Sequence, residues 1–92
     1  MATDEEIKLK IITKMLRGKV TGSKKVTVDT AKGWVASHDE GRAEDLIRDM
    51  ITDPSSPIEA YGGSRDNVRL TSMQDGIDFV KDRGGDLPFN VG

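Results

Sequence analysis

The chain has 92 residues, a formal net charge of −2 and no cysteine. This length suits one domain with a modest core, and the lack of cysteine excludes disulfides, thiol nucleophiles and thiolate zinc sites. Leu, Ile, Val and Phe make up 21 of the 92 residues, above the level of roughly 20% that marks disordered chains. The sequence has no apolar run of membrane-helix length and an acidic start unlike a signal peptide. We therefore expect a single soluble, cytoplasmic domain over residues 1–92 with no membrane partner.

Charge is unevenly distributed along the sequence. Residues 1–7 carry −3, residues 8–33 carry +7 and residues 34–92 carry −6. Such a division is typical of a protein that meets a polyanion on one part of its surface, because neutralising phosphates releases counterions. The alternative is a solvated basic face beside an acidic one.

The first predicted helix begins after Thr3, which has the capping-box spacing with Glu6. One arc of this helix is apolar and the opposite face is basic. The apolar arc contains Ile7, Leu9, Ile11, Ile12, Met15 and Leu16. The basic face contains Lys10, Lys14 and Arg17. Gly18 is expected to end the helix, and residues 18–25 to form a polar loop.

A short strand and a short helix are predicted next. Residues 26–28 alternate and are β-branched throughout, which predicts a strand. A second helix is expected over residues 30–36 with Asp29 or Thr30 as its cap, and its internal glycine is expected to keep it short. Its inward stripe contains Ala31, Trp34 and Val35. We interpret Trp34 as core between the first and third helices rather than as an anchor for a partner.

The third predicted helix covers residues 40–52. Ser37 and Glu40 have the spacing of a second capping box before it. Its inner face contains Ala43, Leu46, Ile47, Met50 and Ile51. Pro54 and Pro57 follow the helix and are expected to stop it, because proline cannot donate a helical hydrogen bond.

A hairpin is predicted from two alternating segments, residues 58–61 and 68–71. Between them lie six turn-forming residues, 62–67, which predict a long, mobile tip. Tyr61 is expected to point outward from the sheet by alternation.

The last predicted helix begins after Thr71 or Ser72 and ends at Gly84-Gly85. Its inner face contains Met73, Gly76, Ile77 and Val80, with Phe79 at the margin. Asp75, Asp78 and Asp82 lie together on its outer face. The tail, residues 85–92, offers Leu87, Phe89 and Val91 for docking.

The sequence does not favour catalysis or metal binding. His38 is the single histidine, and its neighbours Ser37 and Asp39 cannot form a triad from consecutive positions at a helix start. The carboxylates on outward helix faces are best interpreted as solvated surface, and the glycine pairs lack a phosphate-loop pattern. We expect no enzyme activity, no cofactor and no metal site.

The predicted order is helix, short strand, helix, helix, hairpin, helix. Over residues 4–84 this order resembles the winged helix-turn-helix family. The stretch Val68-Arg69-Leu70-Thr71-Ser72-Met73-Gln74-Asp75-Gly76 is similar to the join between the last wing strand and the final helix in many small winged-helix regulators. The resemblance implies an α+β winged-helix fold that binds double-stranded DNA, as a small transcriptional regulator or a chromatin-associated factor. Residues 40–52 would enter the major groove, and residues 62–67 would form the wing tip.

The outward face of the implied groove-reading helix is unusually acidic. It carries Arg42, Glu44, Asp45, Arg48 and Asp49. Acids that face phosphates weaken binding, although Arg42 and Arg48 have the guanidinium fork that reads guanine. Their acidic neighbours predict surface ion pairs instead.

Basic charge gathers instead on the first helix, in the following loop, which includes Lys19, and in the hairpin. The residues expected to bind DNA are Lys10, Lys14, Arg17, Lys24, Lys25, Lys32, Arg42, Arg48, Arg65 and Arg69. Arg65, in the hairpin tip, is the one expected to reach a minor groove. Binding is expected to be mostly non-specific and salt dependent. The alternative is a protein–protein interaction module, in which the acidic third and fourth helices meet a basic partner or form a homodimer.

Overall fold

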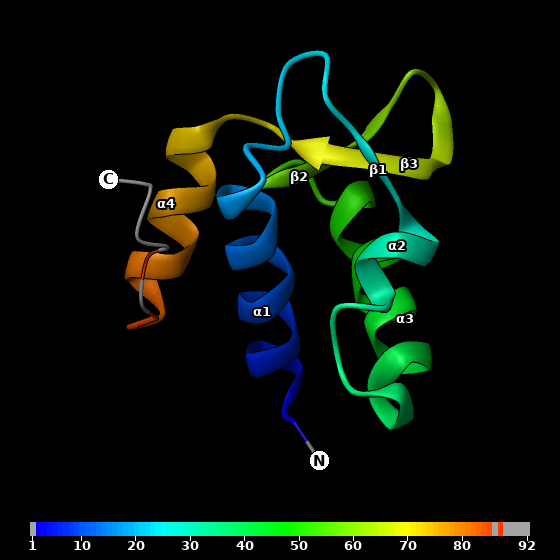
Figure 1. The fold of residues 1–92 in the computed structure, drawn as a ribbon. Helices are drawn as coiled ribbons and strands as arrows, with labels where there is room; N and C mark the ends of the chain where they lie inside the picture. Colours follow the sequence, from blue (N-terminus) through cyan, green and yellow to red (C-terminus); the bar gives the residue numbers. More distant parts are fainter. Residues whose placement is uncertain (1, 86, 88–92) are drawn as a thin grey trace.

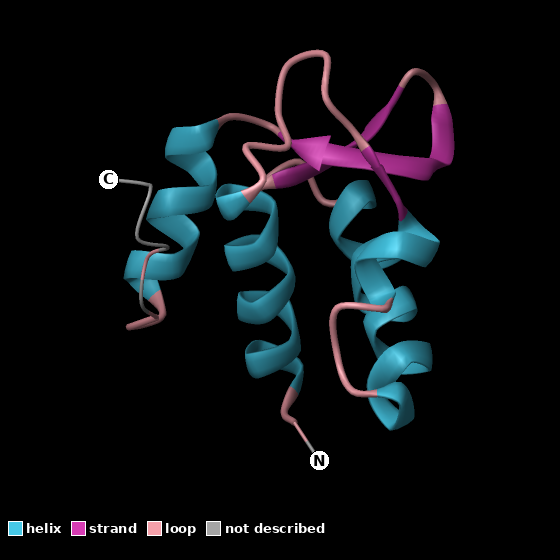
Figure 2. Ribbon diagram, viewed as in Figure 1, coloured by secondary structure: helices cyan, strands magenta, loops and turns pink. Residues whose placement is uncertain are grey.

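A computed structural model of the chain describes residues 2–85 and 87. It is a small α+β domain in which helices lie against one another and an antiparallel sheet covers one end of them (Figure 1, Figure 2). The elements are α1 (Asp4–Arg17), β1 (Val26–Thr27), α2 (Val28–Lys32), the 3₁₀ turn η1 (Ser37–Asp39), α3 (Glu40–Thr52), β2 (Ile58–Tyr61), β3 (Ser64–Leu70) and α4 (Met73–Asp82). The predicted order of elements is confirmed.

The central element is α1, which packs against α3 on one side and α4 on the other (Figure 1). The predicted capping box is present: the Glu6 N–H donates to the Thr3 hydroxyl at 3.2 Å, and the Thr3 N–H donates to the Glu6 carboxylate at 3.0 Å. Five residues of the predicted apolar arc are buried, namely Ile7, Ile11, Ile12, Met15 and Leu16. Leu9, the sixth, is half-buried at the edge of the core. This arrangement leaves the basic face of α1 outside.

The second helix begins earlier than predicted and ends sooner. Val28 belongs to α2 rather than to the strand, and the cap is Thr27, whose hydroxyl accepts the Thr30 N–H at 3.0 Å. Neither Asp29 nor Thr30 is therefore the cap. The helix stops at residue 32 instead of 36, because a glycine follows as its C-cap. The predicted strand shrinks to two residues because a threonine side chain can satisfy the first turn of a helix at this point.

The third helix has the predicted bounds but not the predicted cap. Ser37 starts the turn η1, and Asp39 is the N-cap without a side-chain hydrogen bond to the helix. The Glu40 N–H donates to the Ser37 carbonyl, so the 3₁₀ turn satisfies a donor that the capping box would have used. Asp39 is buried, and His38 beside it is exposed, 3.4 Å from its carboxylate.

The sheet has the order β1-β3-β2, with β3 antiparallel to both neighbours. The hairpin tip is two residues long rather than six, since β3 already begins at Ser64. Gly62 and Gly63 both have positive φ, +67° and +78°, as a tight two-residue turn requires. The register then shifts between Ala60, opposite residue 68, and Tyr61, opposite Ser64, so β3 carries extra residues in an irregular stretch.

The last helix, α4, is capped by Ser72, whose hydroxyl accepts the Asp75 N–H at 3.0 Å. Phe79 is buried, 8% exposed, and not marginal as predicted, because it packs into the core that α1 and α4 share. Leu87 packs against this core as well. The other two tail residues expected to dock, Phe89 and Val91, lie outside the described residues. No helix in residues 2–85 combines the length and the apolar character needed to cross a membrane.

Candidate nucleic-acid interface

The outer face of α1 carries a basic groove. Lys10, Lys14 and Arg17 line it together with Leu9, Thr13 and Gly85, and its volume is about 320 Å³. Among the described residues, no carboxylate lines this groove. Basic side chains at helical spacing along one groove form a surface that attracts anions.

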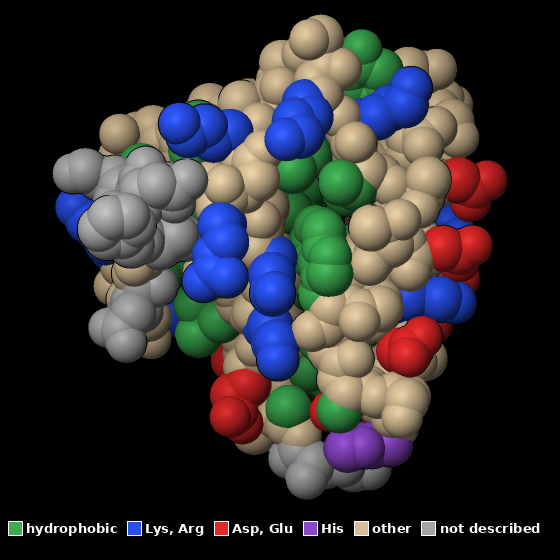
Figure 3. Space-filling model, in the orientation of Figure 1, with side chains coloured by type: hydrophobic (Ala, Val, Ile, Leu, Met, Phe, Trp, Pro, Cys, Tyr) green, Lys and Arg blue, Asp and Glu red, His purple; other side chains and the backbone are tan. Residues whose placement is uncertain are grey.

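The charges are sorted over the face of the molecule that Figure 3 shows. Lys and Arg side chains gather along α1 and over the loops beside the sheet, next to exposed hydrophobic atoms. Asp and Glu side chains lie toward the edges of this view. The division of charge along the sequence therefore corresponds to a division in space on this face.

The loop after α1 is attached to the sheet. The Leu70 N–H donates to the Val20 carbonyl at 2.7 Å, and the Arg69 guanidinium donates to the Gly22 carbonyl. Lys24 donates through Nζ to the Gly18 carbonyl at 2.6 Å, which places an ammonium group at the negative end of α1. The loop predicted from its polar composition is thus held in place at several points along its length.

Tyr61 lies under two cations. The Lys25 ammonium is 5.1 Å and the Arg69 guanidinium 4.9 Å from the centre of its ring. Arg69 also forms an ion pair with Glu59, 2.7 Å long. Tyr61 is half-buried beneath these contacts instead of standing free on the sheet, as alternation alone suggested. Arg69 therefore makes its contacts with residues of the same chain, and the Lys25 ammonium is attracted to the face of the Tyr61 ring.

The two arginines on the outward face of α3 are held by carboxylates. Arg42 donates through Nε and Nη2 to both oxygens of Asp4, at 2.9 and 2.5 Å. These hydrogen bonds raise the pKa of Arg42 and lower the pKa of Asp4. The surface ion pairs predicted for these arginines are confirmed, although the partner of Arg42 comes from the start of α1 and not from a neighbour on its own helix.

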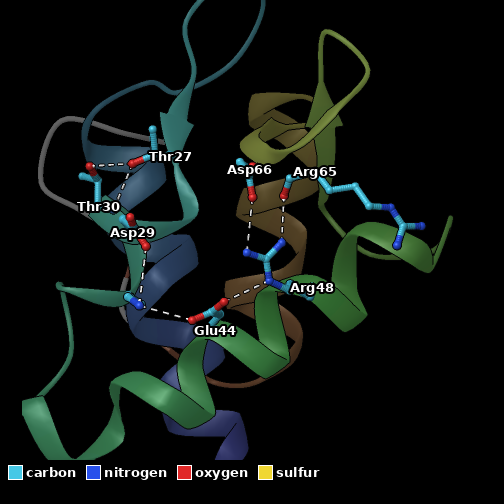
Figure 4. A network of polar contacts seen from close by, with 8 residues as sticks. Thr27, Asp29, Thr30, Glu44, Arg48, Arg65 and Asp66 are labelled. Carbon is cyan, nitrogen blue, oxygen red and sulfur yellow. Dashed lines mark hydrogen bonds and ion pairs between the residues drawn. The ribbon is translucent and has the colours of Figure 1, made fainter.

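Arg48 lies in a network that joins α2, α3 and β3 (Figure 4). Its guanidinium is 3.1 Å from Glu44 and 3.3 Å from Asp66. Glu44 is also 3.2 Å from Lys32, which lies 3.5 Å from Asp29. Hydrogen bonds from Arg48 and Lys32 lower the pKa of Glu44, and Glu44 in turn raises the pKa of Lys32. These cations are neutralised by neighbouring acids.

Arg65 lies in the strand β3 and not in a mobile tip. Its backbone carbonyl accepts from Arg48 at 3.3 Å, while its own side chain points away from that network (Figure 4). The Arg65 side chain is exposed and has no hydrogen bond or ion pair within the described part of the chain. The two-residue turn explains the correction, because it leaves no long tip for Arg65 to occupy.

The ten residues predicted to bind DNA therefore separate into three groups. Four form ion pairs with carboxylates of the same chain, namely Lys32, Arg42, Arg48 and Arg69. The structure brings three others together in the α1 groove: Lys10, Lys14 and Arg17. Lys24, Lys25 and Arg65 belong to the loop and the hairpin.

The acids of α4 line a separate groove of about 440 Å³ between α4 and the segment after α3. Asp75, Asp78 and Asp82 belong to its lining with Asp53, whose pKa is lowered by hydrogen bonds from Ser55. Lys8 and Arg83 also line it, so both signs of charge are present. None of the described residues lines both this groove and the basic groove on α1.

Sequence reasoning missed one feature of the basic region. Lys19 has a left-handed backbone, with φ of +52°. Glycine is the usual signal for that conformation, and Gly18 precedes it by one position in a right-handed conformation with φ of −85°. The sequence signal that could have predicted this conformation is the place of Lys19 directly after the C-cap of α1.

Comparison of the chain with protein-family models, with curated proteins and with solved structures finds no match.

Proposed function

We propose that this chain is a winged-helix DNA-binding protein that contacts phosphates through the exposed face of α1 rather than through α3. The element order and the β1-β3-β2 sheet are compatible with a winged-helix fold. A small regulator or a chromatin-associated factor fits this proposal, with double-stranded DNA as the partner.

The observation that carries the proposal is the contrast between two helices. On α1, Lys10 and Lys14 line one groove, and neither forms an ion pair with a carboxylate of the described residues. On α3, Arg42 and Arg48 are both bound to acids from other elements. A cation that already has a carboxylate partner must lose that pair before it contacts a phosphate, so α1 offers the less costly interface.

This mode of binding has a defined physical signature. Contacts from lysine and arginine to phosphates hold a protein on the duplex without reading its sequence. Each neutralised phosphate releases counterions, so the logarithm of the binding constant falls with the logarithm of salt with a slope of about −0.9 per contact. We therefore expect weak sequence preference and a steep salt dependence.

Fluorescence anisotropy with a short labelled duplex of mixed sequence tests the proposal. The wild-type chain is titrated at several salt concentrations beside Lys14→Gln and Lys81→Gln. Lys81 is an exposed lysine on α4, outside the basic groove, so its variant removes the same charge elsewhere. We expect Lys14→Gln to weaken binding and to reduce the steepness of the salt dependence by about 0.9, the value of one phosphate contact. Lys81→Gln should remain close to wild type. No binding by the wild-type chain at low salt would exclude the proposal.

A second candidate function is protein–protein interaction through α3. Asp45 and Asp49 are exposed on this helix and form no ion pair or hydrogen bond through their side chains within the described residues. Their carboxylates are therefore available to a basic partner or to the basic region of a second copy. Reversing both charges to lysine should abolish such an association and leave duplex binding intact or stronger, as sedimentation and anisotropy would measure.

A further inference from the structure

Lys19 occupies an unfavourable backbone conformation that two hydrogen bonds impose. The Lys19 N–H donates to the Leu16 carbonyl and the Val20 N–H donates to the Met15 carbonyl, both at 3.0 Å. These bonds form a Schellman motif at the end of α1, with Lys19 at the position that needs positive φ. Val20, the next residue, is 3% exposed. Lys19 cannot relax its backbone without breaking these bonds and withdrawing Val20 from the core.

The same motif ends α4, and there the position is glycine. The Gly84 N–H donates to the Lys81 carbonyl at 3.1 Å and the Gly85 N–H to the Val80 carbonyl at 2.9 Å, with φ of +70° at Gly84. Within the described part of the chain, Lys19 is the single non-glycine residue with positive φ. A side chain in this conformation brings its Cβ close to the following carbonyl, which destabilises the fold relative to glycine.

The Lys19 side chain makes no contact with the described residues that offsets this cost. The neighbouring loop lysines each have a partner, since Lys24 donates to Gly18 and Lys25 lies over Tyr61. Lys19 is exposed, and its side chain makes no hydrogen bond, ion pair or ring contact with the residues described. Where the fold requires positive φ but not a particular side chain, a strained non-glycine residue is found most often at a site that binds another molecule.

We propose that Lys19 is a phosphate-contacting residue, kept as lysine for this contact at the expense of stability. This inference rests on the proposed function. It extends the basic surface from the α1 groove past the end of the helix, where the backbone is fixed on both sides of Lys19 by hydrogen bonds. Among the three loop lysines, Lys19 is also the one whose ammonium group has no partner in the described part of the chain.

Three substitutions separate the charge from the strain. Lys19→Arg keeps both, Lys19→Gln keeps the strain and removes the charge, and Lys19→Gly removes both. We expect Lys19→Gln and Lys19→Gly to weaken binding of a labelled mixed-sequence duplex by the same factor, about three- to tenfold at low salt, with Lys19→Arg near wild type. Lys19→Gly alone should raise the melting temperature, by about 4–8 °C. Lys81→Gln is the control for loss of one positive charge.

The outcomes of these measurements test the role of Lys19 separately from the proposed DNA binding. If the wild-type chain binds no duplex at low salt, the proposed function fails and the role of Lys19 falls with it. If the wild-type chain binds and Lys14→Gln weakens binding, while Lys19→Gln matches Lys81→Gln, the function stands and the inference is overturned. A higher melting temperature of Lys19→Gly with unchanged affinity would also overturn it, because the strain would then serve no binding.

Discussion

The guanidinium of Arg48 on α3 lies 3.3 Å from the carboxylate of Asp66 on β3, and this ion pair ties the helix to the hairpin. Asp66→Asn should loosen the attachment, because Arg48 would lose a negatively charged partner and keep Glu44 and the Arg65 carbonyl. We expect amide exchange in β3 to become about two- to fivefold faster.

DNA affinity provides the second readout for Asp66→Asn, with Asp45→Asn as the matched loss of one negative charge. Because we place the interface on α1, the two variants should bind duplex DNA equally well. A larger gain for Asp66→Asn would mean that the released Arg48 reaches DNA, which would contradict an interface confined to α1 and its loop.

Acid should weaken the fold through the ion-paired carboxylates. Hydrogen bonds from Arg48 and Lys32 lower the pKa of Glu44, and those from Arg42 lower the pKa of Asp4. A folded pKa below the unfolded value stabilises the protein at neutral pH, and the contribution is lost as pH falls through about 4 and below. The urea midpoint should therefore decrease between about pH 5 and pH 3, and Glu44→Gln should flatten this decrease. An equally steep decrease in Glu44→Gln would argue against the Glu44 network as a cause.

Two helical glycines should respond to alanine in opposite directions. A Cβ at Gly76 would lie 2.8 Å from Cδ2 of Leu16, a fully buried side chain, and 3.2 Å from Cδ2 of Leu70. Overpacking of this kind costs about 1–3 kcal/mol, against a gain in helix propensity of about 1 kcal/mol. Gly76→Ala should therefore lower the free energy of unfolding by up to about 2 kcal/mol.

Gly41 provides the contrast on α3. A Cβ there meets nothing within 4 Å, so Gly41→Ala should stabilise the chain by about 0.5–1 kcal/mol. Chemical denaturation of both variants measures the two differences. Stabilisation by Gly76→Ala would show that α1 and α4 can separate without loss, contrary to the close approach at this point.

The hairpin turn should discriminate between substitutions at Gly62. Its φ of +67° is accessible to asparagine and strained for alanine. Gly62→Ala should cost about 1 kcal/mol, and Gly62→Asn clearly less, as urea denaturation would show. Equal stabilities for the two variants would indicate that the tip is not held in this tight turn.

Local patterns in the sequence predicted the main secondary-structure elements of this protein and their order. The Thr3–Glu6 capping box, the bounds of the third helix at residues 40–52 and the order of the elements depend on residues a few positions apart, and all three are present. The wrong predictions also concern short segments, where the same residues are compatible with two different local structures. Thr27 capped a helix instead of extending a strand, and Gly62-Gly63 closed the hairpin at once.

The basic region was partly predictable. The positions of Lys10, Lys14 and Arg17 on one face follow from the helical repeat alone. Which cations would pair with a carboxylate did not follow, because ion pairs depend on distances that the fold sets.

By itself the sequence determined the element order, most of the buried stripe of each helix and the grouping of cations on α1, since each depends on a short-range repeat. Only the tertiary structure decided that Arg42 pairs with Asp4, 38 positions away, and that Arg48 pairs with Asp66. It alone also placed Lys19 in a left-handed conformation, because burial of Val20 and two backbone hydrogen bonds outweigh the preference of a lysine for negative φ.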